Sequence, residues 1–339
     1  MTIALQSIPS FTAAEALAVA EAEFGIVGKL SPLPSERDQN FLLVRADGGK
    51  FVLKIANSND PAELLDFQNQ AMRRVENSRI ACRVQQVVAT RQGFDIAAIR
   101  GTKAGTEHCV RLLTWIDGEV LAKCSARGPS LFESIGANMA KIDAALCGFT
   151  HPAMRRILQW DLRQAGMARE HAGLLPHARR SHVARLFSLW EGIDWTVLRH
   201  GVIHGDANDY NVIVGDGRMV GLLDFGDIVY TAIVCDLAIT LAYCLLGAPD
   251  PRPVAAQVIR AYHRQYPLTD AEQQALFPLM LSRLALSVCY SAHNRARNPD
   301  DPYQVVSEAA AWDLLGKLEL WPAADAQALC KAACVEAAK

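Results

Sequence analysis

Residues 200–228, which read HGVIHGDANDYNVIVGDGRMVGLLDFGDI, contain the pattern that decides the fold. Two apolar runs, 212–214 and 220–223, lie on either side of a Gly-Asp-Gly turn and predict a β-hairpin. Folding of this hairpin would bring together two side chains that precede it and one that follows it: Asp206, Asn211 and Asp224. Their hard oxygen atoms suit Mg²⁺ that carries phosphate, and one carboxylate is left to take a proton from a hydroxyl group.

The spacing of these residues is typical of a phosphotransferase core. An H-x-D-x-x-x-x-N segment comes first, the hairpin follows, and Asp-Phe-Gly completes the pattern at 224–226. Protein kinases place their catalytic-loop Asp and Asn, and then Asp-Phe-Gly, in the same order. However, Gly205 and Asn208 stand where protein kinases carry Arg and usually Lys, and no Ala-Pro-Glu segment follows. The pattern therefore favours a small-molecule kinase over a protein kinase.

The chain resembles the aminoglycoside phosphotransferase/choline kinase superfamily, and within it the hydroxylysine kinases and their bacterial relatives. The segments that carry the resemblance are FVLKIANSND with FQNQ, HGDANDYNVIV, and LDFGDIVY through DLAIT. The resemblance implies a protein-kinase-like bilobal α+β fold, with a five-stranded antiparallel sheet and a helix in the N-terminal lobe and a mostly helical C-terminal lobe. The nucleotide-binding lobe would span residues 1–116, with a hinge near 113–117, and the catalytic and acceptor-binding lobe would span 117–339.

Local patterns in the first 116 residues agree with such a sheet. Strand-like runs occur at 26–30, 40–46, 50–56, 82–89, 95–100 and 107–114. Segments 11–24 and 61–75 predict helices, and Thr12 with Glu15 predicts a capping box at the start of the first. The loop at 31–39 lies where a kinase fold covers the phosphates, but it contains no glycine. An ordinary polar hairpin loop is therefore an equal alternative.

Candidate nucleotide-binding residues lie along the predicted sheet. Lys54, in FVLKI, is either a solvent-facing residue or the lysine that pairs with the α- and β-phosphates, and its place on the third strand favours the second. Asn40 would add a polar contact to the phosphates. Gln68 occupies the helix position where the superfamily usually has a lysine-orienting glutamate. The resemblance implies that three hinge residues contact the purine, with core packing as the alternative for the tryptophan: Leu113, Thr114 and Trp115.

The resemblance also implies roles around the catalytic loop. Asp206 would take the acceptor's proton, while Asn211 and Asp224 would hold Mg²⁺. Histidine titrates near neutrality and could act as a base, but the resemblance implies that His204 orients the loop instead. Asp236 would brace the loop by accepting hydrogen bonds. An amino-acid acceptor needs a cation for its carboxylate and acids for its amines. The candidates, each equally a solvated or structural charge, are Asp209, Asp227 and Arg283.

Composition limits the class of protein. The 339 residues are 51% hydrophobic and 21% charged with a net charge of −2, so neither disorder nor a nucleic-acid-binding surface is indicated. The nine cysteines form no C-x-x-C motif and lie mostly in apolar runs, as expected for free thiols in a reducing cytosol. The most apolar window, 231–248, contains Asp236 and is short for a membrane span, so a buried helix is expected. These features predict a cytoplasmic protein without membrane or nucleic-acid partners.

Taken together, the sequence predicts a Mg²⁺-dependent kinase that transfers the γ-phosphoryl group of ATP or GTP. The resemblance implies that the acceptor is the hydroxyl group of an amino-acid-like alcohol such as 5-hydroxylysine. Alternative acceptors are other small alcohols, namely homoserine, choline or an aminoglycoside. An alternative of another class is a nucleotide-binding pseudokinase, which the glycine-free loop and the missing helix glutamate favour. The presence of Lys54, Asp206, Asn211 and Asp224 favours an active enzyme instead.

Overall fold

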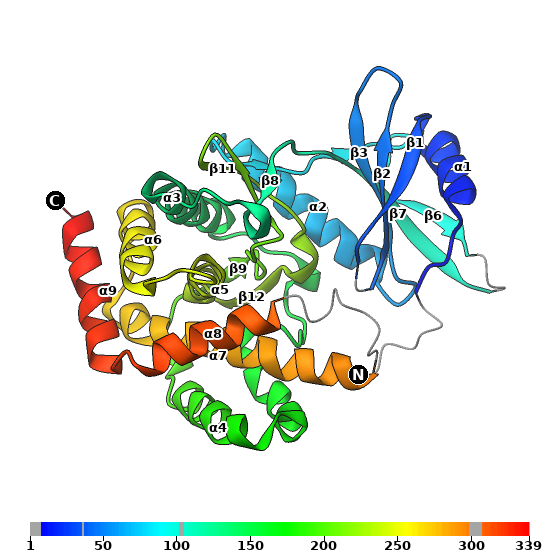
Figure 1. Cartoon of the computed structure of the whole chain (residues 1–339). Helices are drawn as coiled ribbons and strands as arrows, with labels where there is room; N and C mark the ends of the chain where they lie inside the picture. Colours follow the sequence, from blue (N-terminus) through cyan, green and yellow to red (C-terminus); the bar gives the residue numbers. More distant parts are fainter. Residues whose placement is uncertain (1–7, 36, 102–104, 298–306, 339) are drawn as a thin grey trace. The chain divides into compact units, whose positions relative to one another are not determined.

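The computed structural model describes residues 8–35, 37–101, 105–297 and 307–338. The chain divides into two compact units. The first comprises Met1–Asn77, Val84–Asp117 and His151–Ala153, and the second comprises Ser78–Arg83, Gly118–Thr150 and Met154–Lys339. The largest sheet belongs to the first unit and most helices to the second (Figure 1). The predicted mixed α+β class is therefore confirmed.

An antiparallel sheet forms most of the first unit (Figure 1). Its strands follow the order β1-β2-β3-β7-β5, and β6 also pairs with β7. The bounds are β1 (Lys29–Leu33), β2 (Gln39–Val44), β3 (Lys50–Ile55), β5 (Val87–Val88), β6 (Ala97–Arg100) and β7 (Glu107–Thr114). Within the described residues the sheet thus has six strands, one more than the five expected from the sequence. The short strand β4 is Arg83–Val84.

The first strand differs from its prediction. A strand was expected at 26–30, followed by a loop at 31–39, whereas β1 begins at Lys29 and continues to Leu33. Residues Ser31 to Leu33 pair with Leu42 to Asn40 of β2, and this pairing extends the strand into the expected loop. Pro32 is tolerated within β1 because the strand lies at an edge of the sheet, where one side needs no backbone donor. The loop that remains is therefore shorter than expected.

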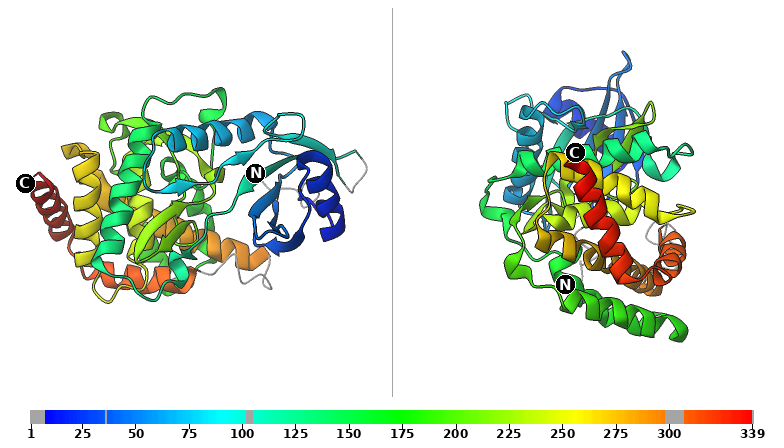
Figure 2. Two further views of the ribbon diagram at one scale, coloured as in Figure 1. Left: turned by 90° about the horizontal axis from the view of Figure 1, so that it is seen from above. Right: turned by 90° about the vertical axis from the view of Figure 1, so that its left-hand side faces the viewer.

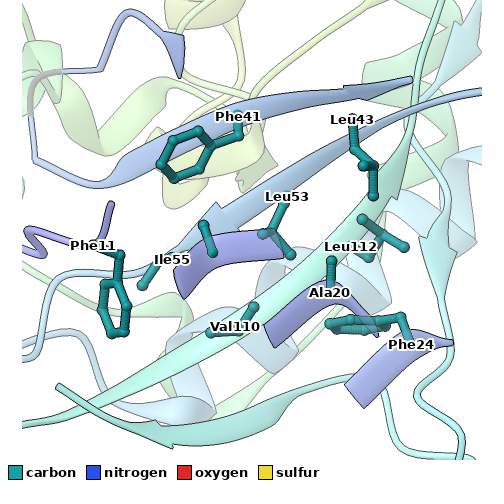
Figure 3. Close-up of a cluster of buried hydrophobic side chains, with 10 residues drawn as sticks. Phe11, Ala20, Phe24, Phe41, Leu43, Leu53, Ile55, Val110 and Leu112 are labelled. Carbon is teal, nitrogen blue, oxygen red and sulfur yellow. The ribbon is translucent and has the colours of Figure 1, made fainter. Parts of the chain in front are cut away.

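Helix α1 (Ala13–Phe24) covers one face of this sheet (Figure 3). Phe41, Leu43, Leu53, Ile55, Val110 and Leu112 point from the strands toward Ala20 and Phe24 of the helix, and Phe11 completes the cluster. The capping box predicted at Thr12 and Glu15 is confirmed, and Gly25 ends the helix in the left-handed conformation with φ 69°. Because alternate residues of a strand face opposite sides, the polar residues between these apolar ones face away from α1. Helix α2 (Ala62–Asn77) is the other helix of this unit.

The second unit contains the predicted hairpin. It consists of β10 (Val212–Gly215) and β11 (Arg218–Leu222), which pair antiparallel around Asp216 and Gly217. Strand β8 (Glu119–Val120) adds to β10, and β9 (His200–Ile203) pairs with β12 (Val229–Ala232). The helices are α3 (Pro129–Leu146), α4 (His177–Glu191), α5 (Val234–Cys244), α6 (Pro251–Gln265), α7 (Asp270–Arg297), α8 (Glu308–Glu319) and α9 (Ala323–Ala337).

These helices build a second core. Helix α3 packs on α6, α5 packs on α7, and α9 lies alongside α6, as Figures 1 and 2 show. Every residue of α5 is buried, as expected for the apolar window at 231–248, although its first residues belong to β12. The capping box predicted at Thr269 and Glu272 is confirmed at the start of α7. The last predicted helix, 303–320, begins outside the described residues and is observed as α8.

Helix α7 is long and apolar enough to cross a membrane by length and composition alone. However, 83% of its most apolar window is buried inside the protein. It also carries buried polar residues such as Ser282 and Arg283, and Pro278 lies in its interior. The helix is therefore packed as a core helix of the second unit.

Candidate active site

The loop at residues 204–211, which the sequence predicts to be the catalytic loop, begins directly after β9 and is held by a buried carboxylate. Asp236, in the first turn of α5, is 0% exposed, and its two oxygen atoms accept hydrogen bonds from the backbone of the loop. The N–H groups of His204 and Gly205 donate to Asp236 Oδ2 and Oδ1 at 3.0 Å and 2.9 Å. A side chain at Gly205 is excluded, because φ is +81° and a Cβ would lie 2.6 Å from the Asp227 carbonyl oxygen. The loop thus starts from a fixed position.

His204 is oriented by hydrogen bonds at both ring nitrogens. Nδ1 accepts from the backbone N–H of Asp206 at 3.2 Å, and Nε2 lies 3.0 Å from the carbonyl oxygen of Leu223. This pair of contacts assigns the neutral tautomer with its proton on Nε2. Burial lowers the pKa of His204, which also favours the neutral ring. His204 therefore links the loop to the strand end before Asp224, in agreement with an orienting role.

Asp206 and Asn211 are in direct contact. The side-chain amide of Asn211 donates to the Asp206 backbone carbonyl and to its Oδ2, both at 2.9 Å. Asn208, which the sequence interpretation did not assign a role, donates to the same Oδ2 at 2.8 Å. Asn208 also accepts from the N–H groups of Tyr210 and Asn211, an Asx-turn arrangement that its Asn-Asp-Tyr-Asn context could have indicated. The loop therefore fixes the Asp206 carboxylate from one side.

Asp224 comes next to Asn211 through the hairpin. Val212 pairs with Leu222, and the N–H of Leu223 donates to the Asn211 carbonyl at 2.9 Å. Asp224 itself adopts φ 58°, unusual for a residue with a side chain, and accepts a hydrogen bond from the N–H of Gly226. Strained backbone of this kind concentrates at functional sites. The backbone pairing thus places Asn211, which contacts Asp206, beside Leu223, the residue that precedes Asp224.

The donor set fits a hard cation. The nitrogen of the Asn211 amide donates to Asp206, which leaves its carbonyl oxygen as the atom that could bind a cation. No cluster of three or more His, Cys, Asp or Glu side chains suited to a metal occurs among the described residues. Mg²⁺ does not need such a cluster, because one or two carboxylates together with substrate phosphates and water complete its octahedron. The residues present therefore fit a nucleotide-bound Mg²⁺ better than a resident structural metal.

Arg283 of α7 is the counter-ion of Asp206. Its Nη2 donates to Asp206 Oδ1 at 2.7 Å and to the Tyr243 hydroxyl at 3.2 Å. The guanidinium lies over the rings of Trp160 and Tyr243, with 4.8 Å and 5.3 Å to the ring centres. The Arg283 side chain is only 3% exposed, whereas Asp206 keeps 19% of its side chain exposed. The cation predicted to bind the acceptor thus contacts Asp206, the carboxylate predicted to be catalytic, and Tyr243 is a further residue that the sequence did not single out.

The charges around Asp206 are crowded. Burial raises the pKa of Asp206 to about 8, and Arg283 opposes this shift, while the negative charges of Asp227 and Asp224 add to it. Asp209 is 7% exposed, and burial raises its pKa to about 6. Asp209 Oδ1 has no hydrogen-bond partner in the described part of the chain. A divalent cation at Asn211 and Asp224 would offset this local excess of negative charge.

The candidate phosphate-binding residues of the first unit lie side by side. Asn40 on β2 and Arg111 on β7 are the cross-strand neighbours of Lys54 on β3. Lys54 and Arg111 are buried, with 7% and 3% of their surface exposed, on the face opposite α1. Asn40 Oδ1 is buried and has no hydrogen-bond partner among the described residues. A buried amide oxygen without a donor, next to a buried lysine, indicates a site that is completed by a ligand or by water.

Gln68 engages Arg111 of the sheet. Its side-chain oxygen accepts from Arg111 Nη2 at 2.6 Å, and Asn69 Oδ1 accepts from Nη1 at 2.8 Å. Arg111 Nη1 also donates to the backbone carbonyl of Leu65 at 3.3 Å. Arg111 thereby connects α2 to the strand that neighbours Lys54. That Gln68 orients Lys54 stays a prediction. Gln68 contacts Arg111, the cross-strand neighbour of Lys54, so an effect of Gln68 on Lys54 would pass through Arg111.

We expect Gln68→Leu to lower the free energy of unfolding by about 1 to 3 kcal/mol, because Arg111 loses an acceptor in a buried environment. Gln70→Leu is the matched control, since Gln70 is exposed on the same helix and donates to the exposed Asp66. Its effect should stay within about 0.5 kcal/mol. Urea denaturation of the full chain measures both. Equal losses in the two variants would contradict the bracing role of Gln68.

The predicted hinge residues continue the sheet. Thr114 makes two hydrogen bonds to Gln86, the residue before β5: its backbone N–H donates to the Gln86 carbonyl at 2.9 Å, and its side-chain Oγ1 accepts from the Gln86 N–H at 2.9 Å. Leu113 pairs with Val52 and Val87 and is 2% exposed. The N–H of Trp115 donates to the Lys50 carbonyl at 3.3 Å. Purine binding by these residues stays a prediction.

Comparison with known proteins gives consistent matches. Residues 29–275 match the family described as the phosphotransferase enzyme family. Hydroxylysine kinase of Mus musculus is 30% identical over 341 residues, which cover 91% of this chain and 90% of that protein. Homoserine kinase of Rhodopseudomonas palustris is 28% identical over 256 residues, which cover 74% of this chain and 73% of that protein.

A solved structure shares the fold. Amicoumacin kinase hAmiN, in complex with AMP-PNP, Ca²⁺ and Ami, matches with a TM-score of 0.70 at 16% sequence identity. The match covers 91% of this chain and 94% of that chain. At this identity the likeness supports the fold alone.

Proposed function

Because the chain belongs to the phosphotransferase enzyme family, we propose that it is a Mg²⁺-dependent kinase of an amino-acid-like alcohol such as 5-hydroxylysine. The chain is a phosphotransferase that acts on an alcohol group of a small molecule. Beyond this activity, we propose that the metal is Mg²⁺, that the donor is ATP or GTP, and that the acceptor is an amino-acid-like alcohol. The observation that carries it is the direct contact of Asp206 with Asn211, together with the backbone bond that places Asn211 beside the strand end at Asp224.

In the proposed reaction Asp206 positions the acceptor hydroxyl group and then takes its proton. Oδ2 of Asp206 is held by Asn208 and Asn211, and Oδ1 by Arg283, so the exposed part of the carboxylate has one orientation. The acceptor oxygen forms its bond to the γ-phosphorus while the bond from that phosphorus to the leaving diphosphate oxygen breaks. The proton passes to Asp206 late, because the transition state is loose and positioning provides most of the acceleration.

Asn211 and Asp224 would hold the metal ion, and a bound Mg²⁺ supplies charge neutralisation on the phosphate oxygens. Lys54 is proposed to pair with the α- and β-phosphates, with Asn40 as a polar contact nearby. We propose that Arg283 acts through Asp206 instead of binding the acceptor's carboxylate, because Asp206 and Tyr243 already share its Nη2. Asp209 and Asp227 remain the proposed partners of the acceptor's amines.

Hydroxylysine and homoserine are both amino acids that carry a hydroxyl group, and relatives of this chain bear both names. The hydroxylysine kinases cover more of this chain, 91% against 74%, and this favours the longer diamine acceptor. The negative charges of Asp227 and Asp224 beside Asp206 also favour an acceptor with two amines over one with a single amine. Homoserine kinase is therefore the second candidate.

Purified protein should be assayed with ATP and with GTP against 5-hydroxylysine, homoserine, choline and an aminoglycoside, with and without Mg²⁺. We expect the highest kcat/KM with 5-hydroxylysine, by about tenfold or more over homoserine. Homoserine has only one amine, so one of the two carboxylates proposed to bind amines would have no partner in its complex. Chelation of Mg²⁺ should abolish turnover. A higher kcat/KM with choline or the aminoglycoside would refute the proposed acceptor class. Nucleotide binding without turnover of any acceptor would instead identify a pseudokinase.

A further inference from the structure

A second buried carboxyl group lies behind the catalytic loop and has no role in the reaction described above. Asp143 of α3 is 1% exposed. Its Oδ2 accepts a hydrogen bond from the hydroxyl group of Tyr262 on α6, at 2.5 Å, and Tyr262 is itself 0% exposed. Its Oδ1 is buried and has no N–H or O–H donor within reach in the described part of the chain. The carboxyl group of Asp236 is also a neighbour of Asp143 and acts on it both through its charge and as a side-chain hydrogen-bond partner.

Two carboxylates in contact inside a core cannot both carry a charge without a large cost, unless a cation lies between them. Here the described neighbours add more negative charge, since Glu272 also acts on Asp143. Glu272 is itself paired with Arg199 at 2.6 Å. The pair of Asp143 and Asp236 therefore requires one proton for its two carboxyl groups.

The hydrogen bonds decide which residue carries that proton. Both oxygens of Asp236 accept backbone N–H groups of the catalytic loop, and such bonds stabilise its ionised form. Asp143 accepts a single O–H at Oδ2, and its Oδ1 accepts from no donor among the described residues. A proton on Asp143 turns its contact with Asp236 into a hydrogen bond, and each carboxylate oxygen of Asp236 has a second lone pair to accept it.

We propose that Asp143 is a positioning residue that stays protonated and donates a hydrogen bond to Asp236, the carboxylate that holds the catalytic loop. The contacts then form a continuous series from Tyr262 to Asp143, from Asp143 to Asp236, and from Asp236 to the backbone of His204 and Gly205. Helices α6 and α3 thereby set the orientation of the loop one residue before Asp206. The inference rests on the proposed function only in that the loop is taken as catalytic.

Burial, and after it the negative charge of Asp236, raise the pKa of Asp143 well above its usual value, whereas the hydrogen bond from Tyr262 opposes the shift. Burial likewise raises the pKa of Tyr262, with the charge of Asp143 as the next cause. Both directions agree with a neutral Tyr262 and a neutral Asp143. The pKa directions and the hydrogen bonds therefore place the proton on the same residue, Asp143.

The kinetic test compares two variants of Asp143. Asp143→Asn keeps a carbonyl for Tyr262 and an N–H donor for Asp236, but it has no charge in any state. We expect it to retain kcat within about twofold, whereas Asp143→Leu, which lacks the donor, should lose kcat by about 10- to 100-fold with little change in nucleotide KM. If Asp143 acted as an anion, asparagine would be as damaging as leucine, and that result would overturn the proposal. Equal retention of kcat in both variants would overturn the positioning role.

A spectroscopic test does not depend on turnover or on the leucine variant folding. Infrared difference spectra of the wild-type chain against Asp143→Asn should show the loss of one carbonyl stretch of a protonated carboxylic acid. Glu133→Gln, at an exposed acid on the same helix, is the matched control and should lose only carboxylate bands. If Asp143→Asn loses carboxylate bands instead, the proposal is wrong even where the kinase activity is established. If the wild-type chain phosphorylates no acceptor, the proposed function fails, while the spectrum still decides the state of Asp143.

Discussion

Replacing Asp206 with asparagine should lower kcat by about 10²- to 10⁴-fold while nucleotide KM changes by no more than about threefold. Asparagine has nearly the shape of the carboxylate, but it cannot take the proton of the acceptor hydroxyl group. It also offers a single oxygen where Asn208, Asn211 and Arg283 now donate to two. Steady-state kinetics with 5-hydroxylysine measures kcat, and calorimetric titration with a Mg-nucleotide measures binding.

Two further variants separate this role from general damage to the hairpin. Asp224→Asn should weaken Mg-nucleotide binding more than it lowers kcat at saturation, because it removes a metal ligand and not the base. Asp216→Asn is the neutral control, since Asp216 lies exposed in the hairpin turn at φ 49° and asparagine tolerates that conformation. Equal loss of kcat and of nucleotide affinity in Asp206→Asn would argue against the proton-accepting role.

Local sequence patterns were sufficient for much of the fold. The hairpin at 212–222 and the capping boxes at Thr12 and Thr269 depend on residues only a few positions apart, and all were predicted correctly. The support of the catalytic loop by Asp236 came from the family resemblance, and the contacts agree with it. The start of β1 was misplaced because its strand partner, β2, decides where pairing ends, and pairing is a property of two segments.

The remaining site contacts join residues that are distant in the sequence. Arg283 lies 77 residues after Asp206, Arg111 lies 43 residues after Gln68, and Tyr262 lies 119 residues after Asp143. Arg283 and Arg111 lie in a helix and in a strand, where an arginine side chain is usually expected to be exposed to solvent. Only the packing of α3, α6 and α7 in the second unit, and the contact of α2 with β7 in the first, shows that these side chains are buried and paired. Arg283 was accordingly predicted as a substrate contact, because its residue type was visible in the sequence and its neighbour was not.

Arg283→Met should have the second large effect, on folding and catalysis together. Removing one partner of a buried ion pair leaves the other charge uncompensated, and such changes cost about 3 to 5 kcal/mol of unfolding free energy. Methionine fills much of the space between Trp160 and Tyr243, so loss of charge and not of volume should dominate. Without the guanidinium, the pKa of Asp206 should rise further, because Arg283 is the first opposing influence on it. The base would then be less available, and kcat at neutral pH should fall by about tenfold or more.

The double variant Asp206→Asn/Arg283→Met tests whether the two residues act on each other. If Arg283 serves mainly as the counter-ion of Asp206, asparagine removes the uncompensated charge, and the double variant should be more stable than Arg283→Met alone. Arg264→Met, at an exposed arginine of α6, should change stability by no more than about 0.5 kcal/mol. If Arg283 bound the acceptor's carboxylate instead, its loss would raise the KM of the amino-acid acceptor and leave the stability of the free protein nearly unchanged. Denaturant unfolding of the three variants, with acceptor KM for Arg283→Met, therefore distinguishes a counter-ion from a substrate anchor, because only a counter-ion couples to Asp206 in the absence of substrate.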